Sequence, residues 1–145
     1  MKKIELKFWL SCMVMALCVG FTSCSDDDDE GIAGDAKTLI IGTWQSTWTK
    51  GYEIYDGEKE EWDEAYTNEV YTFKKDGTGT YKDEYDNSTD PFTWSISGNK
   101  LKLTYDDNDS DEVVIRTLNE NTAVLVVQYK DKDTEYYDEM TFKKK

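Results

Sequence analysis

The chain has 145 residues, with 31 acidic side chains, 17 lysines and arginines and no histidine, and its net charge is −14. Such an excess of negative charge repels nucleic acid and attracts cationic partners. Without histidine the chain cannot build a Ser-His-Asp or Cys-His catalytic centre, or a histidine-ligated metal site. We therefore expect a protein that is not an enzyme, uses no cofactor or metal and binds no nucleic acid.

Residues 1–23 have the pattern of a secretory signal peptide. Lys2, Lys3 and Lys7 form a basic leader, and the segment 8–21 is almost wholly apolar. This apolar run is shorter than the roughly 20 residues that a helix needs to span a bilayer. Its length fits the apolar core of a signal that is removed from the mature protein.

Cys24 follows two small residues, and this arrangement resembles the signal of bacterial lipoproteins, in which the cysteine carries lipid and becomes the first mature residue. The resemblance implies lipidation of Cys24 and attachment to a membrane through the N-terminal lipid. Cys18 fits less well, because a large leucine precedes it. An ordinary cleaved signal with an incidental cysteine is the alternative. Removal of the signal takes Cys12 and Cys18 with it, which leaves no free thiol and no disulfide.

Residues 24–38 are expected to form an acidic, flexible tether. Five consecutive acids, Asp26 to Glu30, repel one another and cannot form a core. The glycines and alanines of residues 31–37 continue the tether. An acidic run directly after a lipidated cysteine also resembles the surface-export signal of Bacteroidetes-type lipoproteins. That resemblance implies an outer-membrane lipoprotein of the cell envelope, exposed on the cell surface, and the alternative is a plain linker facing the periplasm.

Residues 39–145 show strand after strand in an alternating pattern. In PFTWSISGNKLKLTY, apolar and polar residues alternate on both sides of Gly98-Asn99, which is a strong hairpin signal. Asp76-Gly77 supplies a similar turn in YTFKKDGTGTY. Three further apolar segments follow: DEVVIRTL, TAVLVVQY and TEYYDEMTF.

With IIGTWQSTWT as the first, these segments make eight strands, nearly all joined by short turns. Sequence neighbours should then be spatial neighbours, and a meander of this length removes its edges by closing into a barrel. The sequence predicts an all-β domain, an eight-stranded antiparallel up-and-down barrel over residues 39–145. A β-sandwich is the alternative, but it needs a long crossover between sheets.

Gly42-Thr43-Trp44 opens the first strand in the way that a Gly-x-Trp motif does in lipocalins and fatty-acid-binding proteins. Together with the hairpins and the terminal TFKKK, it resembles the lipocalin-like domains of Bacteroidetes-type lipoproteins. The resemblance implies that Gly42 and Trp44 close one end of the barrel, which binds a small apolar or amphipathic ligand. One departure is that Arg116, the only arginine, lies in a middle strand and not near the last, where the family places an arginine on the tryptophan.

The segment 50–68 does not fit the regular meander. Asp56-Gly57 is a hairpin signal within it, so we expect an extended β-arm or a lid. Its aromatic residues and the preceding tryptophan are candidates for a ligand mouth, although they could equally plug the barrel and pack on its core. A second possible function is a protein-interaction or inhibitor module, whose acidic surface and aromatic arm contact a cationic protein. The candidate ligand-binding residues are Trp48, Tyr52, Tyr55, Trp62 and Tyr66.

Asp107, Asp109 and Asp111 occupy alternate positions, as the first ligands of a calcium loop do. The glycine and the distant glutamate of such a loop are missing. An acidic hairpin tip is therefore the favoured interpretation, with calcium binding as the alternative.

Overall fold

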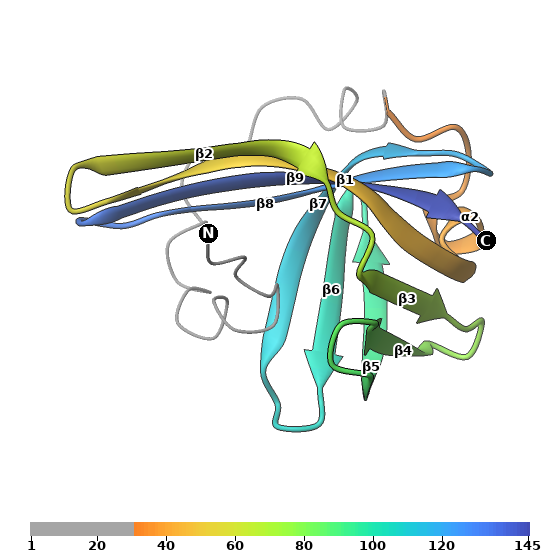
Figure 1. The fold of residues 1–145 in the computed structure, drawn as a ribbon. Coiled ribbons are helices and arrows are strands. Elements are labelled where there is room, and N and C mark those ends of the chain that lie inside the picture. The colour runs from red at the N-terminus through yellow and green to blue at the C-terminus, as the bar shows by residue number, and fades with distance from the viewer. Residues whose placement is uncertain (1–30) are drawn as a thin grey trace.

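The computed structural model describes residues 31–145, which form antiparallel strands and one short helix (Figure 1). The signal peptide, Cys24 and the acidic run up to Glu30 lie outside the described residues. The elements are α2 (Ala36–Leu39), β1 (Gly42–Tyr55), β2 (Glu58–Ala65), β3 (Glu69–Phe73), β4 (Thr78–Asp83), β5 (Ser88–Ser97), β6 (Lys100–Tyr105), β7 (Ser110–Leu118), β8 (Thr122–Lys130) and β9 (Thr134–Lys144).

The strands form one sheet in the order β2-β1-β3-β4-β5-β6-β7-β8-β9, and β1 also pairs with β9. Every one of these pairings is antiparallel. β1 and β3 to β9 thus form a closed eight-stranded barrel, and β2 is an additional strand outside it. The predicted up-and-down barrel is confirmed, and the sandwich is excluded.

The predicted turns lie where the sequence placed them. Gly98-Asn99 joins β5 to β6, and Asp76-Gly77 lies between β3 and β4. In the second turn the Asp76 carboxylate accepts hydrogen bonds from the Thr78 N–H and hydroxyl. Asp56-Gly57 joins β1 to β2, and both residues have positive φ, as a tight two-residue hairpin turn requires.

The apolar core fills the interior of the barrel from Ile40 and Trp44 beside α2 to Tyr136 and Met140 of β9. Its aromatic rings contact one another in stacked, tilted and edge-to-face arrangements, with Tyr71 at the centre of four such contacts. Alternate residues of β5 to β7 point inward, as their sequence pattern predicted. The buried core includes Ile40, Trp44, Tyr71, Phe73, Tyr81, Phe92, Ile96, Leu101, Leu103, Val113, Ile115, Leu118 and Phe142.

Trp44 lies at the α2 end of the barrel and is only 1% exposed. Its indole N–H donates a hydrogen bond of 2.8 Å to the carbonyl of Ile40, directly after α2. The Lys144 ammonium lies 5.1 Å from the centre of the Trp44 ring. A β-carbon at Gly42, whose φ is +133°, would come within 2.6 Å of Lys144 Cε. A lysine of the last strand therefore takes the place expected for an arginine, while Arg116 lies elsewhere.

The stretch 31–38, which we expected to belong to the flexible tether, contacts the barrel. Ile32 pairs with Leu118 of β7 in a parallel bridge, and the Ala33 N–H donates to the Leu118 carbonyl. Ile32, Ala36 and Leu39 also pack against the core. These apolar contacts and the bridge hold this segment against the barrel, although its glycines and alanines suggested a linker.

An arm of four strands extends beyond the barrel. β1 pairs through residues 42–45 with β3 and through residues 48–55 with β2. Its other edge pairs with β9 over almost its whole length, and β9 pairs in turn with β8 as far as Lys130. β2, β1, β9 and β8 therefore leave the barrel side by side (Figure 1). The expected β-arm is present, but it is broader than a single hairpin.

We predict that Trp44→Ala strongly destabilises the barrel. Loss of a buried tryptophan costs about 3–5 kcal/mol, because the cavity that remains is only partly refilled. Trp48, on the same strand, is 44% exposed, so Trp48→Ala should cost about 1 kcal/mol or less. Urea unfolding of both variants measures the difference, and similar losses would contradict the assignment of Trp44 to the core.

Candidate functional site

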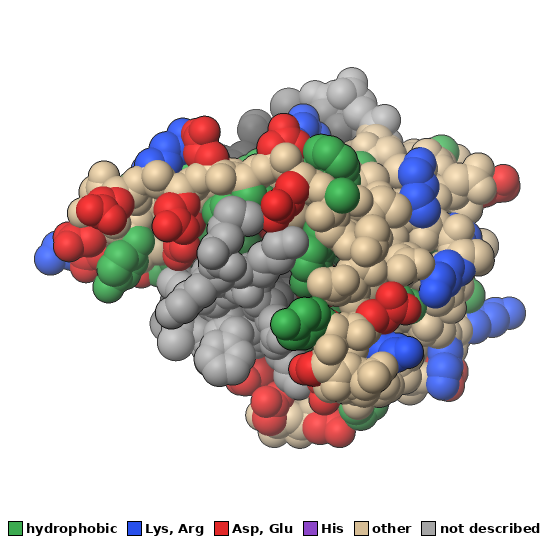
Figure 2. Space-filling model, viewed as in Figure 1, with side chains coloured by type: hydrophobic (Ala, Val, Ile, Leu, Met, Phe, Trp, Pro, Cys, Tyr) green, Lys and Arg blue, Asp and Glu red, His purple; other side chains and the backbone are tan. Residues whose placement is uncertain are grey.

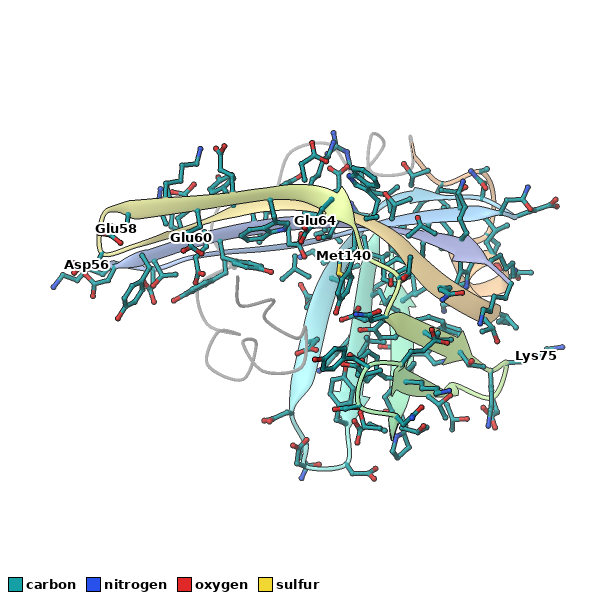
Figure 3. The ribbon with its side chains drawn as sticks, in the orientation of Figure 1. Asp56, Glu58, Glu60, Glu64, Lys75 and Met140 are labelled. Carbon is teal, nitrogen blue, oxygen red and sulfur yellow. The ribbon has the colours of Figure 1, made fainter. Side chains whose placement is uncertain are left out.

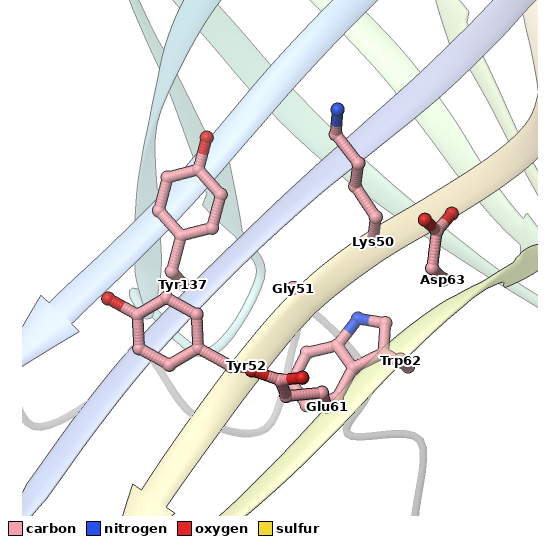
Figure 4. Close-up of a pocket in the computed structure, with 7 residues that line it drawn as sticks. All are labelled: Lys50, Gly51, Tyr52, Glu61, Trp62, Asp63 and Tyr137. Carbon is pink, nitrogen blue, oxygen red and sulfur yellow. The ribbon is translucent and has the colours of Figure 1, made fainter.

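The outer face of the arm carries an open cleft of about 470 Å³ (Figure 4). Alternate residues of a strand point to the same face, so the cross-strand pairs Lys50–Asp63 and Tyr52–Glu61 share the outer face and flank the Gly51–Trp62 pair. Gly51 and Trp62 lie between them at the base, and Tyr137 of β9 completes the lining.

The polar groups of this outer face are already paired with one another. The Tyr52 ring stacks on Tyr137 at 5.9 Å between ring centres, and its hydroxyl donates to Glu135 at 2.7 Å. Lys130 also contacts Glu135 at 2.7 Å. The hydrogen bonds from Lys130 and Tyr52 hold the pKa of Glu135 below its usual value. Arg116 pairs with Glu139 on the same face. The cleft is therefore open, and the charged side chains on its face pair with one another.

The inner face of the arm is different, because a buried carboxylate organises it. Asp138 accepts hydrogen bonds from the Thr49 hydroxyl at 2.6 Å and from the Trp62 indole N–H at 2.9 Å. The Trp62 ring lies 5.7 Å from that of Tyr136 and covers Gly51, where a β-carbon would come within 3.0 Å of it. The glycine allows the indole to reach across β1 to β9.

Acidic side chains also line the barrel interior at the end that bears the arm. Glu69 of β3 and Asp83 of β4 are direct cross-strand partners, and both are buried. Asp111 of β7 faces inward on the same side as Val113 and is 2% exposed. Two oxygen atoms in this region have no hydrogen-bond partner: the Tyr71 hydroxyl and Asp111 Oδ2.

The ionisation of these groups is strongly shifted. Burial raises the pKa of Asp111 to about 7, the charges of Asp109 and Asp107 act in the same direction, and a hydrogen bond from Tyr105 opposes them. Burial also raises the pKa of Asp138, although its hydrogen bonds favour the charged form. The pKa of Tyr71 is raised well above its usual value, first by burial and then by the charge of Glu69. This end of the barrel is therefore acidic and poorly solvated.

A closed eight-stranded barrel with a buried Gly-x-Trp tryptophan agrees with the comparison to known protein families. The family model of the lipocalin-like domain matches residues 40–145. The chain belongs to the lipocalin-like domain family. No curated protein matches this lipocalin-like chain. Among the residues that the structure describes, no helix is long and apolar enough to cross a membrane.

The structure separates the aromatic residues that the sequence grouped together. Trp48 lies on the outer face and donates from its indole N–H to Asp63 at 2.6 Å. Tyr52 lies in the outer cleft, and Tyr55 is 62% exposed at the tip of the arm. Trp62 and Tyr66 pack against the barrel core, and the Tyr66 hydroxyl reaches Glu69 at 3.5 Å. Two of the five residues thus lie beside the interior of the barrel.

Sequence reasoning missed the inward-facing polar residues. Asp111, Val113 and Ile115 alternate along β7, and this spacing alone was enough to place Asp111 inside. The same alternation holds for Glu69, Tyr71 and Phe73 in β3. The alternation therefore indicates inward-facing acids, but acidic residues at strand ends are typical of turns and favour that interpretation.

The three aspartates of the β6–β7 hairpin do not converge. Asp107 accepts a hydrogen bond from the backbone N–H of Asp109 at the exposed turn, whereas Asp111 is buried in the barrel. Within residues 31–145, no group of three or more acids, cysteines or histidines is placed to hold a metal ion. The geometry fits the acidic hairpin tip and not a calcium loop.

We predict an unusual pH dependence from Asp111. Its pKa is raised from 3.8 to about 7, so the folded protein binds this proton more tightly than the unfolded chain. The resulting stability is fully present below about pH 4 and is lost as the pH rises through about 7. Between these limits the unfolding free energy of the wild type should fall by a few kcal/mol relative to that of Asp111→Asn.

Urea unfolding across the pH range measures this difference. Asp106→Asn, which removes an exposed acid from the same hairpin, should follow the wild type. Parallel profiles for Asp111→Asn and the wild type would show that Asp111 ionises normally.

Proposed function

We propose that this protein is a lipid-anchored envelope lipoprotein whose barrel binds a small amphipathic ligand at the arm end. Membership of the lipocalin-like family supports a binding role for the barrel. The basic leader, the apolar segment 8–21 and Cys24 support the anchor, and the acidic run after Cys24 supports display on the cell surface. No step of this role requires catalysis.

The observation that carries the proposal is the pair of oxygen atoms without partners, the Tyr71 hydroxyl and Asp111 Oδ2. Buried polar atoms in folded proteins nearly always have a hydrogen-bond partner, because a missing partner costs about 1–3 kcal/mol. Two such atoms at one end of a barrel are explained if a ligand supplies the hydrogen bonds. The polar part of that ligand would lie near Asp111.

The apolar part of the ligand would contact aromatic residues. The ring centres of Tyr71 and Tyr81 lie 4.9 Å apart beneath the acidic residues. Trp62 and Tyr136 contribute a second aromatic surface from the inner face of the arm. Met140 lies where the arm joins the barrel (Figure 3). Of the residues selected from the sequence, we assign Trp62 and Tyr66 to this ligand.

A protein-interaction module is the second candidate function, and the outer face and tip of the arm favour it. Trp48 and Tyr55 are exposed there, beside the acids of β2. Glu61 and Asp63 lie on the outer face, where Asp63 accepts a hydrogen bond from Trp48, and Glu58 and Glu60 lie near the tip of the arm in Figure 3. Figure 2 shows further acidic side chains along the arm. A cationic protein would find both charge complementarity and aromatic contacts on this surface.

The two tryptophans of the arm distinguish these functions. We predict that the full chain, purified without detergent, carries a small molecule detectable by native mass spectrometry. Trp62→Ala should lower the occupied fraction several-fold, because the inner face loses its largest apolar contact, and Trp48→Ala should leave it unchanged. An unoccupied wild type, or equal losses in both variants, would contradict a ligand site at the arm end.

The anchor has its own test. Cys24→Ala should abolish labelling of the chain by a fatty-acid tracer in a bacterial host and leave a soluble or unprocessed form, because no other cysteine follows a suitable signal. Cys18→Ala is the matched control and should be labelled like the wild type. Continued labelling of Cys24→Ala would show that the lipoprotein assignment is wrong.

A further inference from the structure

We propose that the ligand of the barrel is an organic cation, whose ammonium group lies beside Asp111 and the hydroxyl of Tyr71, at the end of the barrel that also buries Glu69 and Asp83. This inference rests on the proposed ligand-binding function and specifies the charge of the ligand. Three independent features of the described residues support it: the acids themselves, the positions of the basic side chains, and the unsatisfied oxygen atoms.

The acids at this end of the barrel are buried, and no ion pair between described residues involves Asp83 or Asp111. Asp83 is 5% exposed and stands directly opposite Glu69. Like charges on opposite residues of an antiparallel pair destabilise a sheet. Asp83 receives a hydrogen bond from the backbone N–H of Tyr85, and Glu69 receives the hydroxyls of Tyr66 and Tyr81. These contacts solvate the oxygens but add no positive charge.

Basic side chains of the described chain lie elsewhere. Every lysine and arginine in residues 31–145 is exposed except Lys144, which is partly buried. Lys144 lies on the Trp44 ring at the α2 end and is therefore unable to pair with Asp83 or Asp111. The ion pairs between described residues involve other acids, among them Glu61, Glu112, Glu135 and Glu139.

The unsatisfied oxygen atoms point to a ligand that donates hydrogen bonds. Tyr71 is 3% exposed, its hydroxyl has no partner, and the charges of Glu69 and Asp111 both act on it. Asp111 Oδ2 also lacks a donor. An ammonium group has only donors, so it can satisfy both atoms at once and offset the charge of the acids. A carboxylate or phosphate ligand would add further repulsion.

The surrounding rings fit the same chemistry. Tyr71 and Tyr81 lie beside the acids, and Tyr105 donates to Asp111. A cation in contact with aromatic faces gains energy from their negative quadrupole, and this gain is larger in a poorly solvated site. The apolar part of the ligand would extend toward Trp62 and Tyr136 on the inner face of the arm. An amine with an alkyl or aromatic tail matches all these groups.

A matched series of probes tests the charge. Octylamine, octanol and octanoate share one tail and differ in the head group, and calorimetry of the full chain at about 150 mM salt limits long-range attraction by the acidic surface. We expect octylamine to bind at least tenfold more tightly than octanol, and octanoate not to bind. Equal binding of octylamine and octanol would overturn the cation assignment but leave the ligand-binding function intact. Failure of all three probes to bind would count against both.

Three variants test where the cation binds. Asp111→Asn should remove most of the preference for octylamine over octanol, whereas Asp106→Asn, which removes an exposed acid nearby, should preserve it. Tyr71→Phe should weaken octylamine binding several-fold and raise the unfolding midpoint of the free protein, because the unsatisfied hydroxyl is gone and the ring remains. Equal effects of Asp111→Asn and Asp106→Asn would show that only surface charge attracts the amine, and the interior site would be wrong.

Discussion

The pairing of β1 with β9 is the constraint on which the barrel and the arm both depend. One edge of β1 is used by β9 from Trp44 to Tyr55, which closes the barrel. Its other edge is divided between β3 and β2. The same backbone ladder therefore closes the core at one end and supports the arm at the other. Loss of this ladder would open the barrel and detach the inner face of the arm from the acidic residues.

The two ends of the barrel differ in the side chains that they bury. At the α2 end the rings pack tightly, and the last strand supplies Lys144 to cover Trp44. At the arm end, buried carboxylates and a hydroxyl without a partner lower the stability of the free protein. Under the proposed function, stability and binding belong to separate layers of one small domain. The packing of the α2-end layer offsets the free-energy cost of burying polar groups in the arm-end layer.

Turns and alternation were readable from the sequence, because both are local. The hairpins at Asp56-Gly57 and Gly98-Asn99 follow from backbone chemistry, and the inward residues of β5 and β6 follow from a period of two. The two faces of the arm were not predictable. A bulge between Ser46 and Trp48 shifts the alternation in β1, so Trp48 turns outward although it has the same parity as Trp44. Alternation already placed Glu69 and Asp111 inside the barrel, but only strand pairing, which is not readable from one sequence, sets Glu69 opposite Asp83.

The composition of β2 has a consequence for how copies of the protein behave near one another. No described strand pairs with the outer edge of β2, so its backbone groups are open to a second chain. Glutamate or aspartate occupies most positions of this strand, EKEEWDEA. An incoming copy of β2 would bring its own acids against them, and like charges at this spacing oppose fibre-like addition. The arm can therefore extend far from the barrel while the acids of β2 oppose pairing of its free edge with a second copy.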